Sequence, residues 1–237
     1  NRTLRLAMAE GLCQAPWRLA LADAEVQGAP GRRLSRGTLF AQAMHLARRW
    51  EPFTLGRVLV VMPDGVAAVI VLLALKLAGK VPVLLPPHLL GTPELAAFLI
   101  REKIGSAVSH TSLRAAHADA PWPDHFLDLQ AEMEALDDLQ VLGDFVFAAL
   151  ATQTMRRVRV EWRRGQDGLG WISRGPDGTL ALTQLTDHTL LAQTEMLRAT
   201  DLVRQSDVIL NCHALASASG QALLWSCLGR GLTLVLA

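Results

Sequence analysis

The chain has 237 residues, 51% of them hydrophobic, so it is long enough to bury a sizeable core as one large domain or two lobes. Its formal net charge is only +1, and its arginines are scattered rather than gathered in a stripe. This charge profile argues against a polyanionic partner, and we expect no nucleic-acid binding.

The cysteines are typical of a reduced protein. Cys13, Cys212 and Cys227 have no metal-ligand spacing and cannot all pair with one another. We expect Cys212 and Cys227 to be core thiols. No N-terminal stretch has the basic, apolar and small-residue order of a secretory signal. Together these features predict a cytoplasmic location and no metal site.

The most apolar segment, residues 58–90, is interrupted by prolines, glycine and charged residues. Its longest uncharged run, Gly65 to Leu75, is far shorter than the roughly 20 residues of a membrane span, so we expect no span. The segment instead predicts a strand, a helix and a strand at residues 57–62, 64–78 and 81–85. Asp64 is expected to cap the helix and Gly79 to end it. Near-continuous apolar strands predict a parallel pair with a right-handed connection.

Helices and strands alternate along the rest of the chain. We expect helices at residues 35–50, 93–102, 187–202 and 219–228, and strands at residues 106–109, 156–162, 207–210 and 232–236. Residues 120–138, with two prolines and several acidic residues, are expected to cross the surface irregularly. The alternation predicts an α/β fold with a mostly parallel sheet flanked by helices. Residues 1–150 and 151–237 are possible sub-lobes.

Residues 173–178, Ser-Arg-Gly-Pro-Asp-Gly, have the outline of a phosphate-binding loop. They follow an apolar step at residues 169–172 and precede the helix expected from residue 187. Backbone N–H groups of a strand, turn and helix in this order can wrap a phosphate. However, no lysine follows Gly178, and Asp177 would direct a negative charge at a phosphate. Because Pro-Asp-Gly is itself a strong turn sequence, a plain turn is the alternative.

Some polar residues allow chemistry without a nucleotide. His213 and Ser217 would share one face if they lay on a helix, as a base and a nucleophile do, but Ser217 has no visible activating partner. A structural histidine is the alternative for His213. His110 and His117 have no carboxylate or cysteine near them in the sequence, and we expect them on the surface.

Three stretches carry a resemblance to a known family. They are Leu34–Leu39 with Leu46-Ala47, residues 58–85, and the loop of residues 173–182 continued by Leu185–Ala192. They resemble the opening helix, the strand–helix–strand segment and the phosphate loop of the adenylate-forming superfamily. That superfamily includes acyl-CoA and acyl-carrier-protein synthetases, peptide-synthetase adenylation domains and luciferase. The resemblance runs from about Pro16 to Leu236 and implies the N-terminal portion of such an enzyme.

The resemblance also implies site residues. On the phosphate-loop signature Ser173, Gly175 and Gly178 match, whereas Leu180-Ala181-Leu182 replaces the family's Pro-Lys-Gly. The implied ATP-binding residues are Ser173, Arg174, Gly175, Gly178 and Thr179, and the Arg174 guanidinium is suited to grip a phosphate. On a second motif Gly220 matches, Ser217 stands where the family has histidine, and His213 lies four residues early. The implied substrate-binding residues are His213, Ser217 and Gly220.

The resemblance implies activation of a fatty or aryl carboxylic acid with ATP and Mg²⁺, followed by transfer to CoA or an acyl carrier protein. The implied partners are a small carboxylic acid and possibly an acyl carrier protein. No residue is assigned a catalytic role, because the family's remaining chemistry would lie beyond Ala237. The alternative is a non-catalytic adenylation-like domain that binds an acyl chain, a carrier protein or a partner subunit. The departures from two family motifs favour this alternative.

Overall fold

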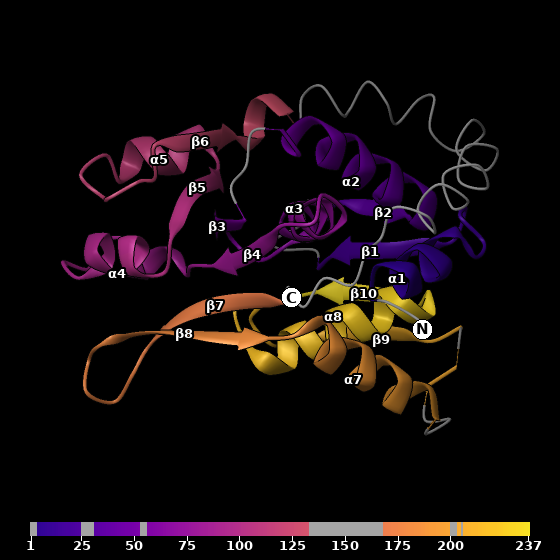
Figure 1. Cartoon of the computed structure of the whole chain (residues 1–237). Coiled ribbons are helices and arrows are strands. Elements are labelled where there is room, and N and C mark those ends of the chain that lie inside the picture. The colour runs from indigo at the N-terminus through magenta and orange to yellow at the C-terminus, as the bar shows by residue number, and fades with distance from the viewer. Residues whose placement is uncertain (1–3, 25–30, 53–55, 133–167, 200–202, 205) are drawn as a thin grey trace.

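The computed structural model describes residues 4–24, 31–52, 56–132, 168–199, 203–204 and 206–237 (Figure 1). The helices are α1 (Leu4–Cys13), α2 (Arg36–Trp50), α3 (Val66–Leu77), η1 (Pro87–Leu89), α4 (Leu95–Arg101), α5 (Thr111–Ala116), α7 (Asp187–Ala199) and α8 (Ala218–Arg230). The strands are β1 (Leu19–Asp23), β2 (Arg33–Ser35), β3 (Arg57–Val61), β4 (Val81–Leu84), β5 (Ile104–Ser109), β6 (His125–Asp128), β7 (Leu169–Arg174), β8 (Leu180–Leu185), β9 (Val208–Asn211) and β10 (Thr233–Leu236).

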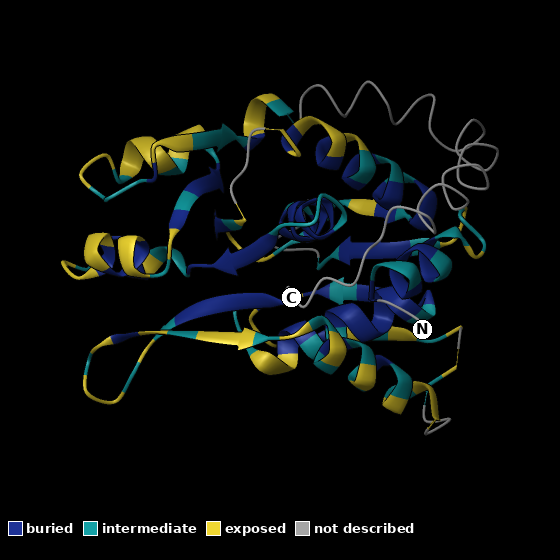
Figure 2. Cartoon of the chain, viewed as in Figure 1, coloured by how far each residue is buried: buried dark blue, intermediate teal, exposed yellow. Residues whose placement is uncertain are grey.

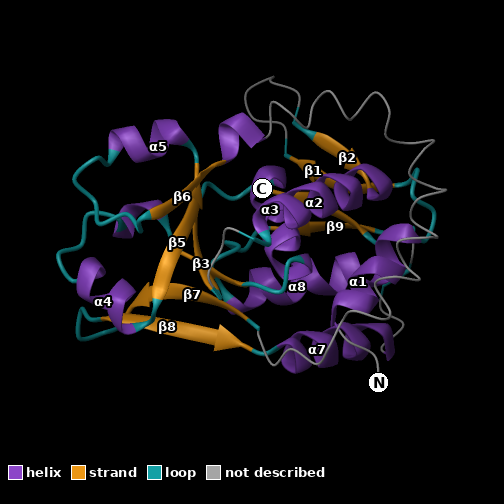
Figure 3. Cartoon of the chain, turned by 45° about the horizontal axis from the view of Figure 1, so that its top comes forward, coloured by secondary structure: helices purple, strands orange, loops and turns teal. Residues whose placement is uncertain are grey.

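The described strands form two sheets. One has four strands in the order β2-β1-β10-β9, and the other has six in the order β6-β5-β3-β4-β7-β8. Neighbouring strands are parallel except at two pairs, β1 with β2 and β7 with β8. Helices pack against these mostly parallel sheets (Figure 3). The predicted α/β class is therefore confirmed.

The predicted strand–helix–strand unit is confirmed as β3, α3 and β4. The two strands pair in parallel, with Val58 opposite Pro82. Gly79 has a φ of 77°, a left-handed conformation that glycine adopts without strain, and it follows the last turn of α3 as predicted.

The predicted cap of α3 is wrong. Asp64 precedes the helix but makes no hydrogen bond to its first turn; its Oδ2 accepts instead from the N–H of Leu215 at 2.9 Å. The first helical N–H, that of Val66, donates to Oδ1 of Asp23 at 2.7 Å. The helix start is therefore stabilised by a carboxylate from the end of β1, on the other sheet.

Two further expectations need correction. The segment 120–138 is not irregular throughout, because residues 125–128 form β6 at the edge of the larger sheet. The sequence analysis also did not predict α1, α5, β1, β2 or β8. The strand expected at residues 156–162 lies outside the described residues. So does the possible sub-lobe boundary at residue 150, which stays a prediction.

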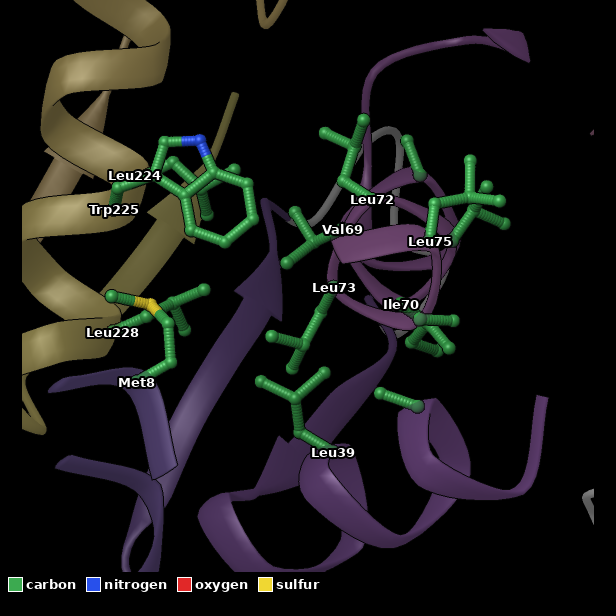
Figure 4. Packing of buried hydrophobic residues seen from close by; sticks show 14 of the residues in the cluster. Met8, Leu39, Val69, Ile70, Leu72, Leu73, Leu75, Leu224, Trp225 and Leu228 are labelled. Carbon is green, nitrogen blue, oxygen red and sulfur yellow. The ribbon is translucent and has the colours of Figure 1, made fainter. Parts of the chain in front are cut away.

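Helix α3 lies at the centre of the molecule. Ten of its twelve residues are buried, which explains why its sequence is apolar all round rather than on one face (Figure 2). It packs against α2, and its buried residues belong to the larger of two hydrophobic clusters, which also includes residues of α1 and α8 (Figure 4). The smaller cluster lies under α4 and includes Ile172 and Leu180 of the β7–β8 pair. Among the described helices, none combines the length and apolar character needed to cross a lipid bilayer.

Candidate functional site

The predicted phosphate loop is the turn of a β-hairpin. Strands β7 and β8 pair in antiparallel register as far as Arg174 opposite Leu180. Beyond that pair, the N–H of Gly178 donates to the carbonyl of Gly175 at 2.9 Å, and the N–H of Gly175 donates to the carbonyl of Thr179 at 2.8 Å. Gly178 has a φ of 81°, so the turn needs a residue that tolerates the left-handed region.

The expected strand–turn–helix order is therefore wrong, because β8 stands between the turn and α7. The N-terminus of α7 therefore does not directly follow the loop, and the expected contribution of its dipole to anion binding there is lost.

The carboxylate of Asp177 occupies donors that a phosphate would need. Its Oδ1 accepts from the N–H of Thr179 at 3.1 Å and from the Thr179 hydroxyl at 2.8 Å. These hydrogen bonds from Thr179 lower the pKa of Asp177, so the group is ionised at neutral pH. The turn is thus closed by its own side chains, with a negative charge at its tip.

The remaining loop residues face neighbouring elements. Arg174 Nη2 lies 3.8 Å from Oε2 of Glu94, and both side chains are about half exposed at 46% and 58%. Ser173 pairs with Ala181 across the hairpin. The one cation of the loop is therefore directed toward the start of α4, near the tip of the hairpin (Figure 1).

The second candidate set lies between β9 and α8, on the smaller sheet. Ser217 is the N-cap of α8: its hydroxyl oxygen accepts from the N–H of Gly220 at 3.1 Å, and its hydroxyl donates to the carbonyl of Ala214 at 2.7 Å. A Cβ on Gly220 would lie 2.1 Å from the Ala214 carbonyl oxygen, so only glycine fits there.

His213 is exposed and lies outside any helix, with its N–H donating to Oδ1 of Asn211 at 3.0 Å. The helical arrangement that would place His213 and Ser217 on one face is therefore absent. The three residues build the turn into α8; a role in substrate binding stays a prediction.

Carboxylates connect this turn to the larger sheet. The Asp64 carboxylate binds the turn at Leu215, while Asp23 binds the start of α3. Burial raises the pKa of the Asp64 carboxyl, and the hydrogen bond from Leu215 opposes part of that rise. The loops at the carboxyl ends of β1, β3 and β9 are thereby held together.

His110 has a carboxylate neighbour that the sequence analysis missed. It follows β5, and the parallel pairing of Ser109 with Asp128 brings the ends of β5 and β6 together. Burial would raise the pKa of Asp128, but hydrogen bonds from Thr111 and Gln130 and the charge of His110 outweigh it and lower the pKa.

The cysteines agree only in part with expectation. Cys227 is buried as predicted, whereas Cys212 is exposed. Burial raises the pKa of Cys13 to about 11 and that of Cys227 to about 12, so neither is a thiolate at neutral pH. No group of three or more metal-ligating side chains gathers within the part of the chain that the structure describes.

Three surface grooves, with volumes of about 450 to 540 Å³, lie around residues 117–124, α4 and α5. Their linings include none of the eight candidate residues. The candidate residues lie in two separate places, at the β7–β8 hairpin and at the entry to α8.

The fold is that of the N-terminal part of adenylate-forming enzymes, as comparison with solved structures shows. No protein-family model matches the sequence, and no curated protein is similar to it by sequence. The structural similarity extends over the whole chain, which confirms the fold that the resemblance implied.

Three solved structures illustrate the match. The inhibitor-bound N-terminal domain of FACL13 from Mycobacterium tuberculosis is 15% identical with a TM-score of 0.74, and the match covers 100% of this chain and 57% of that one. VinN is 13% identical with a TM-score of 0.73, with coverage of 100% and 59%. The o-succinylbenzoate CoA synthetase MenE from Bacillus subtilis, in complex with ATP and magnesium, is 16% identical with a TM-score of 0.70, with coverage of 98% and 44%. The chain thus spans less than two thirds of these proteins.

Proposed function

We propose that this chain is the N-terminal portion of an acid-activating ligase-like protein whose hairpin loop does not hold the phosphates of ATP. The observation that carries the proposal is the closed turn, in which Asp177 takes both donors of Thr179. In this proposal the domain serves as a binding or partner-interaction module. The fold similarity to adenylate-forming enzymes supports the ligase-like origin.

The residues of the loop do not fit a triphosphate. A charged or hydroxyl contact to a phosphate contributes about 1.5–3 kcal/mol, and an ATP affinity between millimolar and micromolar corresponds to about 4–8 kcal/mol. The loop has no lysine, its threonine is occupied, and Asp177 would repel the phosphate oxygens. Three such losses are comparable to the whole free energy that holds ATP in a typical site, so the loop does not fit ATP with Mg²⁺.

The ligand that best suits the proposal is a small carboxylic acid. VinN has been solved in complex with L-aspartate and with 3-methylaspartate, and MenE with a CoA-product analogue. His213, Ser217 and Gly220 are proposed to line the acid site. CoA or an acyl carrier protein is the proposed acceptor or partner, and a cytoplasmic location fits the three free cysteines.

A second candidate function, a ligase that still binds ATP, is favoured by one observation. The ion pair of Arg174 with Glu94 is long and solvent-exposed, so it restrains the guanidinium only weakly. Arg174 is therefore free to turn toward a phosphate and bind it in a bidentate manner.

The proposal is tested by giving the loop the free threonine donors and the lysine that a phosphate loop needs. In the double variant Asp177→Ala/Ala181→Lys, Thr179 is released and a cation is added opposite Ser173 on an exposed position of β8. Titration calorimetry with Mg-ATP should then show saturable binding by the variant, whereas the unchanged protein shows no measurable binding. Asp119→Ala, another exposed aspartate, is the matched control and should change nothing. Tight ATP binding by the unchanged protein would establish the second candidate instead.

A further inference from the structure

A buried lysine lies at the base of the hairpin. Lys76 is the only charged residue of α3, near the helix C-terminus, and its side chain is just 2% exposed. Its Nζ donates to Oδ1 of Asp187 at 2.6 Å and to the carbonyl oxygen of Gly168 at 3.0 Å. A buried ammonium persists only where such partners replace water.

The two partners lie at the points where the chain enters and leaves the hairpin. Gly168 directly precedes β7, and Asp187 begins α7 two residues after β8 ends. Gly168 is itself constrained, because a Cβ there would lie 1.3 Å from the carbonyl oxygen of Leu185. The ammonium therefore joins both ends of the hairpin to α3.

Among the described residues, few other polar side chains contact the hairpin. Strand β7 pairs with β4 only through Gly170 and Trp171, whereas β8 is an edge strand in the described part of the sheet. Toward the tip, Ile172 and Leu180 pack in the smaller hydrophobic cluster, and the exposed Arg174–Glu94 pair adds little. Leu169 and Trp171 pack in the larger cluster, so apolar packing holds both the base and the tip of the hairpin, and Lys76 adds a directional polar contact at the base.

We propose that Lys76 is a positioning residue that fixes the base of the β7–β8 hairpin through Asp187 and Gly168, and thereby sets the orientation of loop 173–179. The positioning role concerns the same loop as the proposed function, but it holds whether or not the loop binds ATP. A lysine suits the task because its ammonium has three donors, enough to bind a carboxylate and a carbonyl together.

The decisive variant is Lys76→Met/Asp187→Leu, which removes the charges but keeps apolar bulk. Replacement of a buried ion pair by apolar residues is often tolerated, so we expect a melting temperature close to that of the unchanged protein. Hydrogen exchange should nevertheless become about tenfold faster in β7 and β8, because their base is released, and stay unchanged in β1 and β10. The control Glu94→Gln removes the exposed pair at the tip and should leave exchange unaltered.

Two outcomes would overturn the positioning role. One is unchanged exchange in β7 and β8 of the double variant; the other is an equal rise in both sheets, which indicates general loosening. If the double variant does not fold, Asp187→Asn is judged by the same criterion, since it removes the carboxylate charge and weakens the contact with Lys76 while keeping a polar side chain of the same size.

ATP affinity is a second measurement, and it connects the Lys76–Asp187 pair to loop 173–179. Adding Asp187→Asn to Asp177→Ala/Ala181→Lys should reduce the acquired ATP affinity several-fold. If Asp177→Ala/Ala181→Lys itself gains no ATP affinity, the proposed function fails. Hydrogen exchange in Lys76→Met/Asp187→Leu still decides the role of Lys76 in that case.

Discussion

The Asp64 residue is exposed over much of its surface, yet its carboxylate turns inward to the N–H of Leu215. Burial raises the pKa of this group, so the folded protein binds the proton more tightly than the unfolded chain does. Its contribution to stability is therefore greatest at acid pH and falls as pH rises through the raised pKa. Asp64 thus links the two sheets, but its ionised carboxylate lowers the stability of the folded protein at neutral pH.

Asp64→Asn should make the protein more stable at pH 7, because the amide oxygen still accepts from Leu215 without carrying a charge. The gain in the urea midpoint should shrink as pH falls below the raised pKa, where the carboxyl is protonated. Urea unfolding at pH 7 and pH 4 measures both effects.

Asp177→Asn is the matched control for that experiment. The pKa of Asp177 is lowered, so its stabilisation is present above the unfolded-state pKa and is lost as pH falls through the lowered pKa. This variant should lose stability at neutral pH rather than gain it. A loss of stability at pH 7 in Asp64→Asn would contradict the assignment.

Gly220 is required by close packing rather than by an unusual φ. In Gly220→Ala the new methyl group would meet the Ala214 carbonyl oxygen at 2.1 Å, and the turn into α8 would have to move. We expect a cost of about 2–4 kcal/mol, or a drop in melting temperature of roughly 5–15 °C. Gly91→Ala, where a Cβ meets nothing within 4 Å, should be nearly neutral in the same thermal scan. Equal melting temperatures for the two variants would refute the packing role.

Helix α3 is the most deeply buried helix of the larger hydrophobic cluster. Leu73 lies near Leu39 of α2 in Figure 4, within the larger hydrophobic cluster. Leu73→Ala should cost about 2–5 kcal/mol, because the surrounding helices cannot all close the cavity. Met196→Ala on the exposed face of α7, where Met196 is 68% exposed, should cost little. Chemical denaturation of both variants tests this; a small effect of Leu73→Ala would show that the cluster is loosely packed.

The central strand–helix–strand unit could be predicted from the sequence because it is buried on both faces, whereas the edge strand β8 could not. Strands β3 and β4 and helix α3 are apolar throughout because protein surrounds them. Strand β8 has buried, intermediate and exposed positions in no strict alternation, so its residues gave no strand signal beside a strong turn sequence. That omission led to the incorrect strand–turn–helix prediction for the loop.

The polar contacts that shape the candidate site were beyond sequence reasoning for a different reason. Val66 is capped by Asp23, 43 positions away, and Lys76 meets Asp187 across 111 positions. Such pairs depend on how the sheets come together, and no local pattern encodes them. By contrast, the hydrogen bonds of Asp177 to Thr179 span two residues, and the Asp-Gly-Thr sequence was a local signal for them.

At the scale of the whole molecule, the chain combines a preserved frame with altered turns. The frame matches adenylate-forming enzymes over the full length of the chain at 11–16% identity. Such low identity is compatible with one fold because a fold requires a pattern of buried apolar residues rather than particular residues. The turns depart from the family at the phosphate loop and before α8. This combination supports the binding module proposed above.

The most direct test of the account is calorimetric titration of the unchanged protein with Mg-ATP, followed by a non-hydrolysable acyl-adenylate mimic that lacks the β- and γ-phosphates. The closed hairpin predicts no measurable binding of Mg-ATP. Binding of the mimic alone would place the defect at the loop that should hold those two phosphates. Saturable binding of Mg-ATP at micromolar concentration would contradict the account, because it would mean that Arg174 and the loop backbone still hold the triphosphate.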